Sequence, residues 1–249
     1  MAKAFPTRRQ RTRRAVIITS LLLFPIIMNY LSPYVILDGA SQGIVNGSLI
    51  LFGLLFLSSL AVGRLWCAWL CPGGGIGEIA TLINDRPGPG GRWNWMKWVI
   101  WVPWLGLIAF LAISAGGYRA VNFLHLTETG VSVSEPQQYV IYYIVVGLFF
   151  GLALAAGRRA ACHTICWMAP FMILGRKLRN LVGWPALRLA AQSEACMHCK
   201  RCTAQCPMSL DVHAMVQARA MEDCECILCG SCVDVCPKDV IRYRIGRGV

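Results

Sequence analysis

Eight cysteines near the C-terminal end of this sequence fall into two runs of identical spacing. Residues 196–207 read CMHCKRCTAQCP and residues 226–237 read CILCGSCVDVCP, so both follow C-x2-C-x2-C-x3-C-P. In this pattern three closely spaced thiolates bind one cubane, and the fourth cysteine ligates the other cluster. The spacing therefore predicts two [4Fe–4S] clusters. The expected ligands are Cys196, Cys199, Cys202 and Cys236 for the first cluster, and Cys226, Cys229, Cys232 and Cys206 for the second.

A zinc ion is the main alternative to an iron–sulfur cluster at clustered cysteines. A structural zinc site needs four ligands, often in two pairs, and eight cysteines in two four-member runs exceed that requirement. Cys224 is left over and is interpreted as a free thiol. His198 and His213 are interpreted as surface histidines, because four cysteines already satisfy each cluster.

Two further cysteine pairs occur much earlier in the chain. Cys67 and Cys71 lie in GRLWCAWLCPGGG, and Cys162 and Cys166 lie in RRAACHTICWMAP. Residues four apart on a helix share one face, with Cβ atoms roughly 5–6 Å apart. If the two segments pack about a pseudo-twofold axis, we expect all four thiols to converge on one point.

An arginine precedes the first cysteine of each pair by three positions, Arg64 before Cys67 and Arg159 before Cys162. Nearby guanidinium groups are expected to lower the thiol pKa and favour thiolates. Three interpretations remain open: inert buried cysteines, a redox-active dithiol or disulfide, and a thiolate-bound metal or iron–sulfur centre. The repeat favours the last, but zinc, copper(I) and iron–sulfur clusters suit four thiolates equally well.

The elements that carry these pairs are apolar and long. Of the 249 residues, 56% are hydrophobic and only 14% are charged, a composition typical of membrane proteins. Stretches of roughly 20 apolar residues can span a bilayer as helices. Four such stretches occur, at about 15–37, 44–66, 96–115 and 139–157.

The distribution of basic residues predicts how these helices are oriented. The N-terminal MAKAFPTRRQRTRR is basic and contains no acidic residue, so the positive-inside rule places both termini in the cytoplasm and the chain in the cell membrane. The net charge of +12 has the same explanation, which argues against nucleic acid as a partner. The predicted fold is an all-α multi-pass domain of two similar hairpins followed by a small α+β ferredoxin domain. Its predicted parts are a basic tail (1–14), a four-helix transmembrane domain (15–166), an amphipathic surface linker (167–192) and a 2[4Fe–4S] ferredoxin domain (193–249).

These motifs together resemble the NapH/NosR/CcoG-type membrane polyferredoxins. The resemblance rests on GRLWCAWLCPGGGIGE after one helix, a second Cys-x3-Cys after another, and the two-cluster C-terminal end. It implies that Cys67, Cys71, Cys162 and Cys166 are membrane redox thiols. Trp167 departs from the pattern, because that family usually has proline after the second cysteine. The layout is nearest to the compact NapH type, which implies an electron-transfer subunit that needs a partner.

The predicted function is electron transfer between cytoplasmic [4Fe–4S] clusters and the membrane cysteines, toward or from quinone or a partner redox enzyme. No acid–base pair or nucleotide-binding loop indicates substrate chemistry of its own, so the chain is predicted to be an oxidoreductase component. The expected partners are the lipid bilayer, redox proteins and quinone, with flavin as a further candidate cofactor. A copper reductase or maturation factor, and a non-catalytic membrane anchor for a ferredoxin module, are the alternatives.

Overall fold

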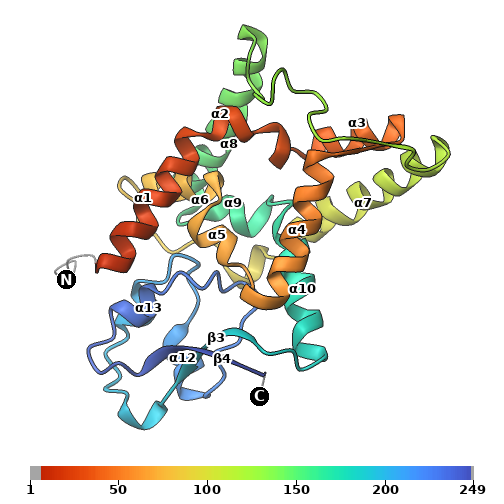
Figure 1. The fold of residues 1–249 in the computed structure, drawn as a ribbon. Helices are drawn as coiled ribbons and strands as arrows, with labels where there is room; N and C mark the ends of the chain where they lie inside the picture. Colours follow the sequence, from red (N-terminus) through yellow and green to blue (C-terminus); the bar gives the residue numbers. More distant parts are fainter. Residues whose placement is uncertain (1–6, 248–249) are drawn as a thin grey trace.

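The computed structural model describes residues 7–247 as a mostly helical chain that ends in a small cysteine-rich module (Figure 1). The first apolar region is not the single helix predicted for 15–37. It divides into α1 (Arg8–Leu22), α2 (Phe24–Ile27), a 3-10 turn (Asn29–Leu31) and α3 (Pro33–Gln42). Pro25 and Pro33 lie in the first turns of α2 and α3. Proline is accepted there, but inside a longer helix it would remove a hydrogen bond and clash with the preceding turn.

The basic tail predicted for residues 1–14 is also not separate from this region. Residues 8–14 form the first two turns of α1, whose N-cap Thr7 accepts a hydrogen bond from the Gln10 backbone N–H. The first six residues of the predicted tail lie outside the described part of the chain.

Within residues 7–247, two helices are long and apolar enough to cross a bilayer, rather than the four predicted. They are α7 (Met96–Ser114) and α8 (Pro136–Ala156), and only 22% and 11% of their apolar windows are buried inside the protein. A third apolar helix, α4 (Gly47–Val62), has 16 residues. At 1.5 Å per residue it is about 24 Å long, shorter than a hydrocarbon core of about 30 Å. The outward apolar faces of α7 and α8 are what a membrane protein presents to lipid.

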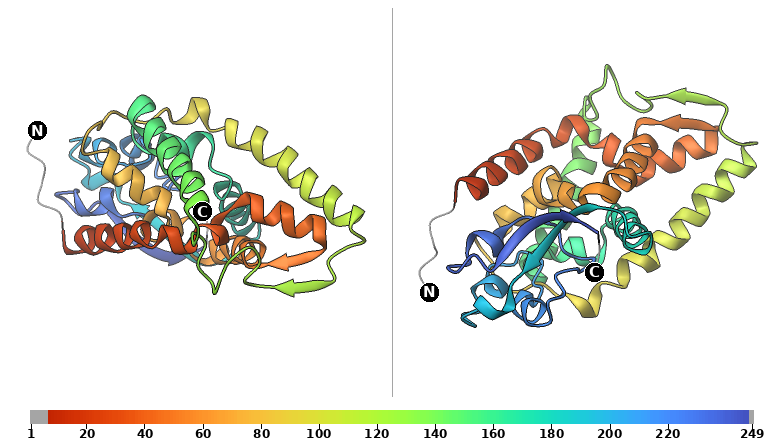
Figure 2. Two further views of the ribbon diagram at one scale, coloured as in Figure 1. Left: turned by 90° about the horizontal axis from the view of Figure 1, so that it is seen from above. Right: turned by 60° about the horizontal axis from the view of Figure 1, so that its bottom comes forward.

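The loops at the far end of these helices are joined by a short sheet. Strand β1 (Ile44–Asn46) pairs in parallel with β2 (Ala120–Asn122), and Gly43 ends α3 in the left-handed conformation. Figure 2 shows this pair away from the C-terminal module.

The two arginine–cysteine segments have the same local architecture. In the first, α4 is followed by the short α5 (Leu65–Trp69) and by α6 (Pro72–Ala80). In the second, α8 is followed by the short α9 (Ala160–Thr164) and by α10 (Ala169–Leu181). Gly63 and Gly157 end α4 and α8 with φ of +59° and +93°, a region that glycine enters without steric cost. A 3-10 turn, Gly91–Trp93, precedes α7.

The C-terminal module contains a two-stranded antiparallel sheet and three short helices. Strand β3 (Ala186–Ala191) pairs with β4 (Ile241–Gly246), so a strand of this sheet lies inside the segment predicted as a linker. The helices are α11 (Arg201–Ala204), α12 (Val212–Gln217) and α13 (Ser231–Asp234), with a 3-10 turn at Ser193–Ala195.

Helix α10 differs from the exposed amphipathic helix that its basic residues predicted. It packs against α4, where Gly175 lies close to Ser59. Arg176 and Arg179 are buried, because both face Glu222 of the C-terminal module. The helix therefore connects the two parts of the molecule through buried charges.

Candidate functional site

The eight cysteines of the C-terminal module line two separate cavities, and in each case three come from one run and one from the other. The outer cysteine set is Cys196, Cys199, Cys202 and Cys236. The inner cysteine set is Cys206, Cys226, Cys229 and Cys232. This is the crossed grouping that the spacing predicts, and the assignment of each cysteine as a cluster ligand remains a prediction.

The backbone around the two sets repeats with a period of 30 residues. Positive φ angles recur at His198 and Leu228 (53° and 54°), at Lys200 and Gly230 (55° and 78°), and at Ser209 and Asp239 (53° and 49°). Positive φ is uncommon for residues other than glycine. Turns that include left-handed residues can direct successive backbone N–H groups into one concavity, a feature of many iron–sulfur sites. The repeated turns therefore fit an anionic cluster beside each set.

Backbone N–H groups also reach the sulfur atoms at equivalent positions. Val240 N–H donates to Cys236 Sγ at 3.4 Å, and Leu210, thirty residues earlier, donates to Cys206. Burial nevertheless raises the pKa of the Cys206 thiol to about 12. A metal that binds there must displace the thiol proton, so binding would be pH-dependent.

The four cysteines of the earlier pairs come together at one place. Cys67, Cys71, Cys162 and Cys166 are all buried and line a single cavity of about 240 Å³. We call this space the four-cysteine cavity. Apolar side chains complete most of its wall, among them Phe24, Met28, Leu31, Ile76, Val145 and Phe149.

The cysteines of each pair do not share a helix face as predicted. Cys67 lies within α5, but the helix ends at Leu70, and Cys71 is the N-cap of α6. In the second segment Cys162 lies within α9 and Cys166 follows its C-cap, Ile165. The second cysteine of each pair instead accepts a backbone hydrogen bond near the start of the following helix. Gly74 N–H donates to Cys71, and Ala169 N–H donates to Cys166.

The expected lowering of the thiol pKa by arginine is wrong for three of these cysteines. Burial is the largest effect, and it raises the pKa of Cys71, Cys162 and Cys166, the last to about 12. Neighbouring thiols raise these values further, whereas Arg159 lowers that of Cys162 by less than burial raises it. Burial thus disfavours thiolates at these three cysteines, and a bound cation would favour them.

Arg64 provides positive charge at the wall of the four-cysteine cavity. Its side chain is fully buried, and Nη1 donates to Glu225 Oε2 at 2.7 Å and to the Cys224 carbonyl at 3.3 Å. Its Nε and Nη2 atoms have no hydrogen-bond partner within the described residues. Buried donors normally have partners. An anionic group bound to the four sulfurs fits both the unpaired donors and the charge.

Trp167, which replaces the proline usual in the resembling family, belongs to the cavity wall. Its indole Nε1 donates to the Leu31 carbonyl at 3.0 Å. α10 begins at Ala169, two residues later than the start of α6 at Pro72 would require, and Pro170 is its second residue. The second pair is therefore held by a different turn, yet both of its thiols reach the cavity.

Two glutamates that the sequence reasoning missed, the partly buried Glu78 and the buried Glu225, hold these elements together. Glu78 accepts from Arg13 at 2.8 Å and from Arg159 at 3.2 Å. The same two arginines donate to the carbonyls of Ala68 and Cys67, so the network supports the backbone of the first cysteine. The available signal was that Glu78 is the lone acidic residue between positions 39 and 84.

The second glutamate, Glu225, joins the C-terminal module to the helical part. It lies between Arg64 and Lys97, with Lys97 Nζ at 2.6 Å from Oε1, and all three side chains are buried. Its neighbour Cys224, predicted to be free, is half-buried and lines none of the three cysteine cavities described above.

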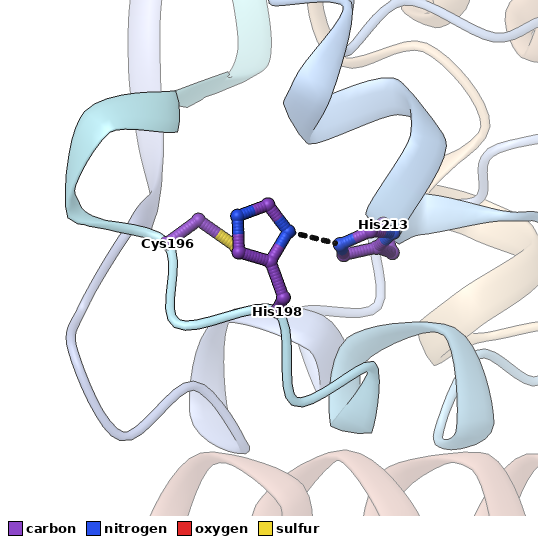
Figure 3. A group of neighbouring side chains, drawn as sticks. All are labelled: Cys196, His198 and His213. Atoms are coloured by element: carbon purple, nitrogen blue, oxygen red, sulfur yellow. Dashed lines mark hydrogen bonds between the residues drawn. The ribbon is translucent and has the colours of Figure 1, made fainter.

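His198 and His213 lie at the rim of the outer set beside Cys196 (Figure 3). His198 Nδ1 is 3.1 Å from His213 Nε2, and one ligand atom from each of the three residues lies within 4.8 Å of the others. This trio could hold a metal ion only by withdrawing Cys196 from the outer set.

Two protein-family models match this chain, and both describe iron–sulfur domains. A 4Fe-4S dicluster domain matches residues 188–243, which contain all eight cysteines of the inner and outer sets. A 4Fe-4S binding domain matches residues 47–89, which contain Cys67 and Cys71. The chain is thus an iron–sulfur protein with two 4Fe–4S-binding regions.

Several characterised or named proteins are distantly similar to it. The nitrogen fixation protein FixG of Rhizobium meliloti is 25% identical over 230 residues, covering 82% of this chain and 42% of that protein. Protein RdxA of Cereibacter sphaeroides is 25% identical over 225 residues, covering 82% and 46%. The putative electron transport protein YccM of Escherichia coli is 22% identical over 219 residues, covering 82% and 57%. The chain thus spans about half the length of these relatives, and no solved structure matches it.

Proposed function

We propose that this chain is a membrane-bound electron-transfer protein with three iron–sulfur centres, one held by each cysteine set and one in the four-cysteine cavity. The observation that carries the proposal is the convergence of four buried thiols from two repeated segments on one cavity. When bound, iron–sulfur clusters supply one-electron redox chemistry with potentials that depend on charge and solvent exposure. The matches to 4Fe-4S domain models and to a putative electron transport protein support this class of function.

Cluster binding in the four-cysteine cavity is favoured over a dithiol by charge. A dithiol or disulfide is neutral, and it would supply no negative charge beside Arg64, which lines the cavity and has unpaired donors. Iron–sulfur is favoured over zinc because a 4Fe-4S binding domain model covers Cys67 and Cys71. In this arrangement Arg64 balances negative charge, and the helix starts at Gly74 and Ala169 donate to sulfur.

We place the C-terminal module and the four-cysteine cavity on the cytoplasmic side of the membrane. The support is the cluster of basic residues on this side, which includes Arg8, Arg64, Arg158 and Arg176, together with the positive-inside rule. The apolar wall of the cavity and the exposed apolar faces of α7 and α8 fit exchange of electrons with an apolar carrier such as quinone.

Iron and acid-labile sulfide per chain test the proposal directly. Anaerobically purified parent protein is compared with a variant in which Cys67, Cys71, Cys162 and Cys166 are all serine. Two four-iron clusters give about eight irons and a third gives about twelve. We expect about twelve in the parent and about eight in the variant. About eight irons in both proteins would refute the third centre. Fewer than eight irons in the parent would refute the assignment of two four-iron clusters to the C-terminal module.

A further inference from the structure

The inner cysteine set lies against the helical part of the protein. Backbone carbonyls of three of its cysteines accept hydrogen bonds from that part: Cys229 from Gln10 (3.0 Å), Cys226 from Arg176 (2.6 Å) and Cys206 from Arg158 (3.4 Å). Arg64 binds the adjoining Cys224–Glu225 segment. The second arginine–cysteine segment therefore contacts the inner set through Arg158, and the first contacts the residues directly before Cys226 through Arg64. In Figure 1 the module lies directly below α5 and beside α10.

The outer cysteine set has the opposite environment. Cys199 is exposed and Cys196, Cys202 and Cys236 are half-buried, whereas three of the four inner cysteines are buried. The side chain of Met197, inside the outer run, is 57% exposed. A protein that binds at this face would come close to the outer set without displacing any part of the chain.

The surface around the outer set is basic. Lys200, Arg201 and Lys238 line the outer-set cavity and are exposed, and no Asp or Glu is among the described residues that line it. Three acidic residues lie near in sequence, and one of them, Glu194, forms an exposed ion pair with Arg219. Asp211, which caps α12 through the Ala214 N–H, and Asp239 together reduce the charge of Lys200, Arg201 and Lys238 from +3 to +1. The remaining excess of positive charge is complementary to an acidic protein surface.

We propose that this face is the docking site of a soluble, acidic one-electron carrier protein. The inference rests on the proposed function, because the outer set must hold a cluster for a docked carrier to exchange an electron with it. The one electron exchanged oxidises one partner and reduces the other, with no bond made or broken. Complementary charge at such a face accelerates encounter and orients the carrier. Its effect weakens at high salt, because the Debye length falls to about 8 Å at 0.15 M.

The test measures binding of an acidic plant-type [2Fe–2S] ferredoxin to the purified, cluster-containing protein in detergent. The test variant is Lys200→Glu with Lys238→Glu. The matched control is Lys177→Glu with Arg244→Glu, which changes the net charge equally at exposed positions outside the outer-set cavity. Each protein is measured at low and at 0.3 M salt, and basic cytochrome c serves as a carrier of opposite charge. Iron and sulfide are determined on every preparation.

We expect the test variant to bind the ferredoxin roughly tenfold more weakly than the parent at low salt, with the difference shrinking at high salt. The control variant should stay within about twofold of the parent, and cytochrome c should not reproduce the pattern. Equal weakening in both variants, or none in the test variant, would overturn the docking site while leaving the clusters in place. Preparations without iron would instead overturn the proposed function.

Discussion

Replacing Glu78 by glutamine should destabilise the protein by about 3 kcal/mol. Burial alone would raise the pKa of this carboxyl, but Arg159 and Arg13 outweigh burial and hold it at about 2, below the usual 4.5. At 1.36 kcal/mol per pKa unit, this shift corresponds to about 3 kcal/mol of stability at neutral pH. The Glu78 side chain is only 13% exposed, so solvent screens this interaction little. In a chain of this size the expected drop in Tm is roughly 6–12 °C.

Thermal unfolding in detergent, followed by tryptophan fluorescence, measures this effect. Because the folded-state pKa is lowered, the stabilisation is fully present above about pH 4.5 and is lost as pH falls toward 2. The Tm difference between parent and Glu78→Gln should therefore be constant from pH 8 to about 5.5 and shrink below 4.5. The control is Glu194→Gln, whose ion pair with Arg219 is exposed on both sides and should be worth at most about 1 kcal/mol. A Glu78→Gln variant that melts within about 2 °C of the parent would refute this reasoning.

Four further substitutions, one of them a control, test the packing, the charges and the cysteine ligands around the site. Gly175→Ala places a methyl group against Ser59 of α4 and should lower the free energy of unfolding by about 1–3 kcal/mol. The control, Gly53→Ala in α4, meets nothing within 4 Å and should be neutral or slightly stabilising. The Tm values of the two variants check this. Glu225→Gln leaves two buried cations without their carboxylate and should cost about 3–5 kcal/mol, seen as faster proteolytic release of the C-terminal module. Cys224→Ser should leave iron and sulfide per chain unchanged, and a loss of about four irons would make this thiol a ligand.

The grouping of the C-terminal cysteines was predictable because cluster ligation depends on short sequence spacing. Three cysteines within seven residues share one loop whatever surrounds them, and the two copies differ by a constant 30 positions. The same locality let the arginine–cysteine repeat be recognised, since α5 and α9 are both five-residue helices with the arginine at the N-cap.

The apolar helices were predictable in part. Composition identifies α7 and α8, because long apolar runs have few alternatives, and α7 stays one helix although Pro103 lies inside it. The region 15–37 has the same composition but contains Pro25 and Pro33, and the prediction gave hydropathy more weight than backbone chemistry. Arg176 and Arg179 of α10 were interpreted as solvated, but they are buried against Glu222, a partner about 45 positions away.

The sequence by itself determined which residues can hold iron and sulfur, because thiolate spacing is a local property. Only the tertiary structure decided that Cys67 and Cys162, 95 positions apart, line one cavity and that Arg64, which has unpaired donors, lines the same cavity. It also decided that the inner set faces the helical part while the outer set faces solvent. These relations depend on packing and on ion pairs such as Arg64–Glu225, whose partners are 161 positions apart. Spacing along the chain carries no information about such pairs until the fold brings them together.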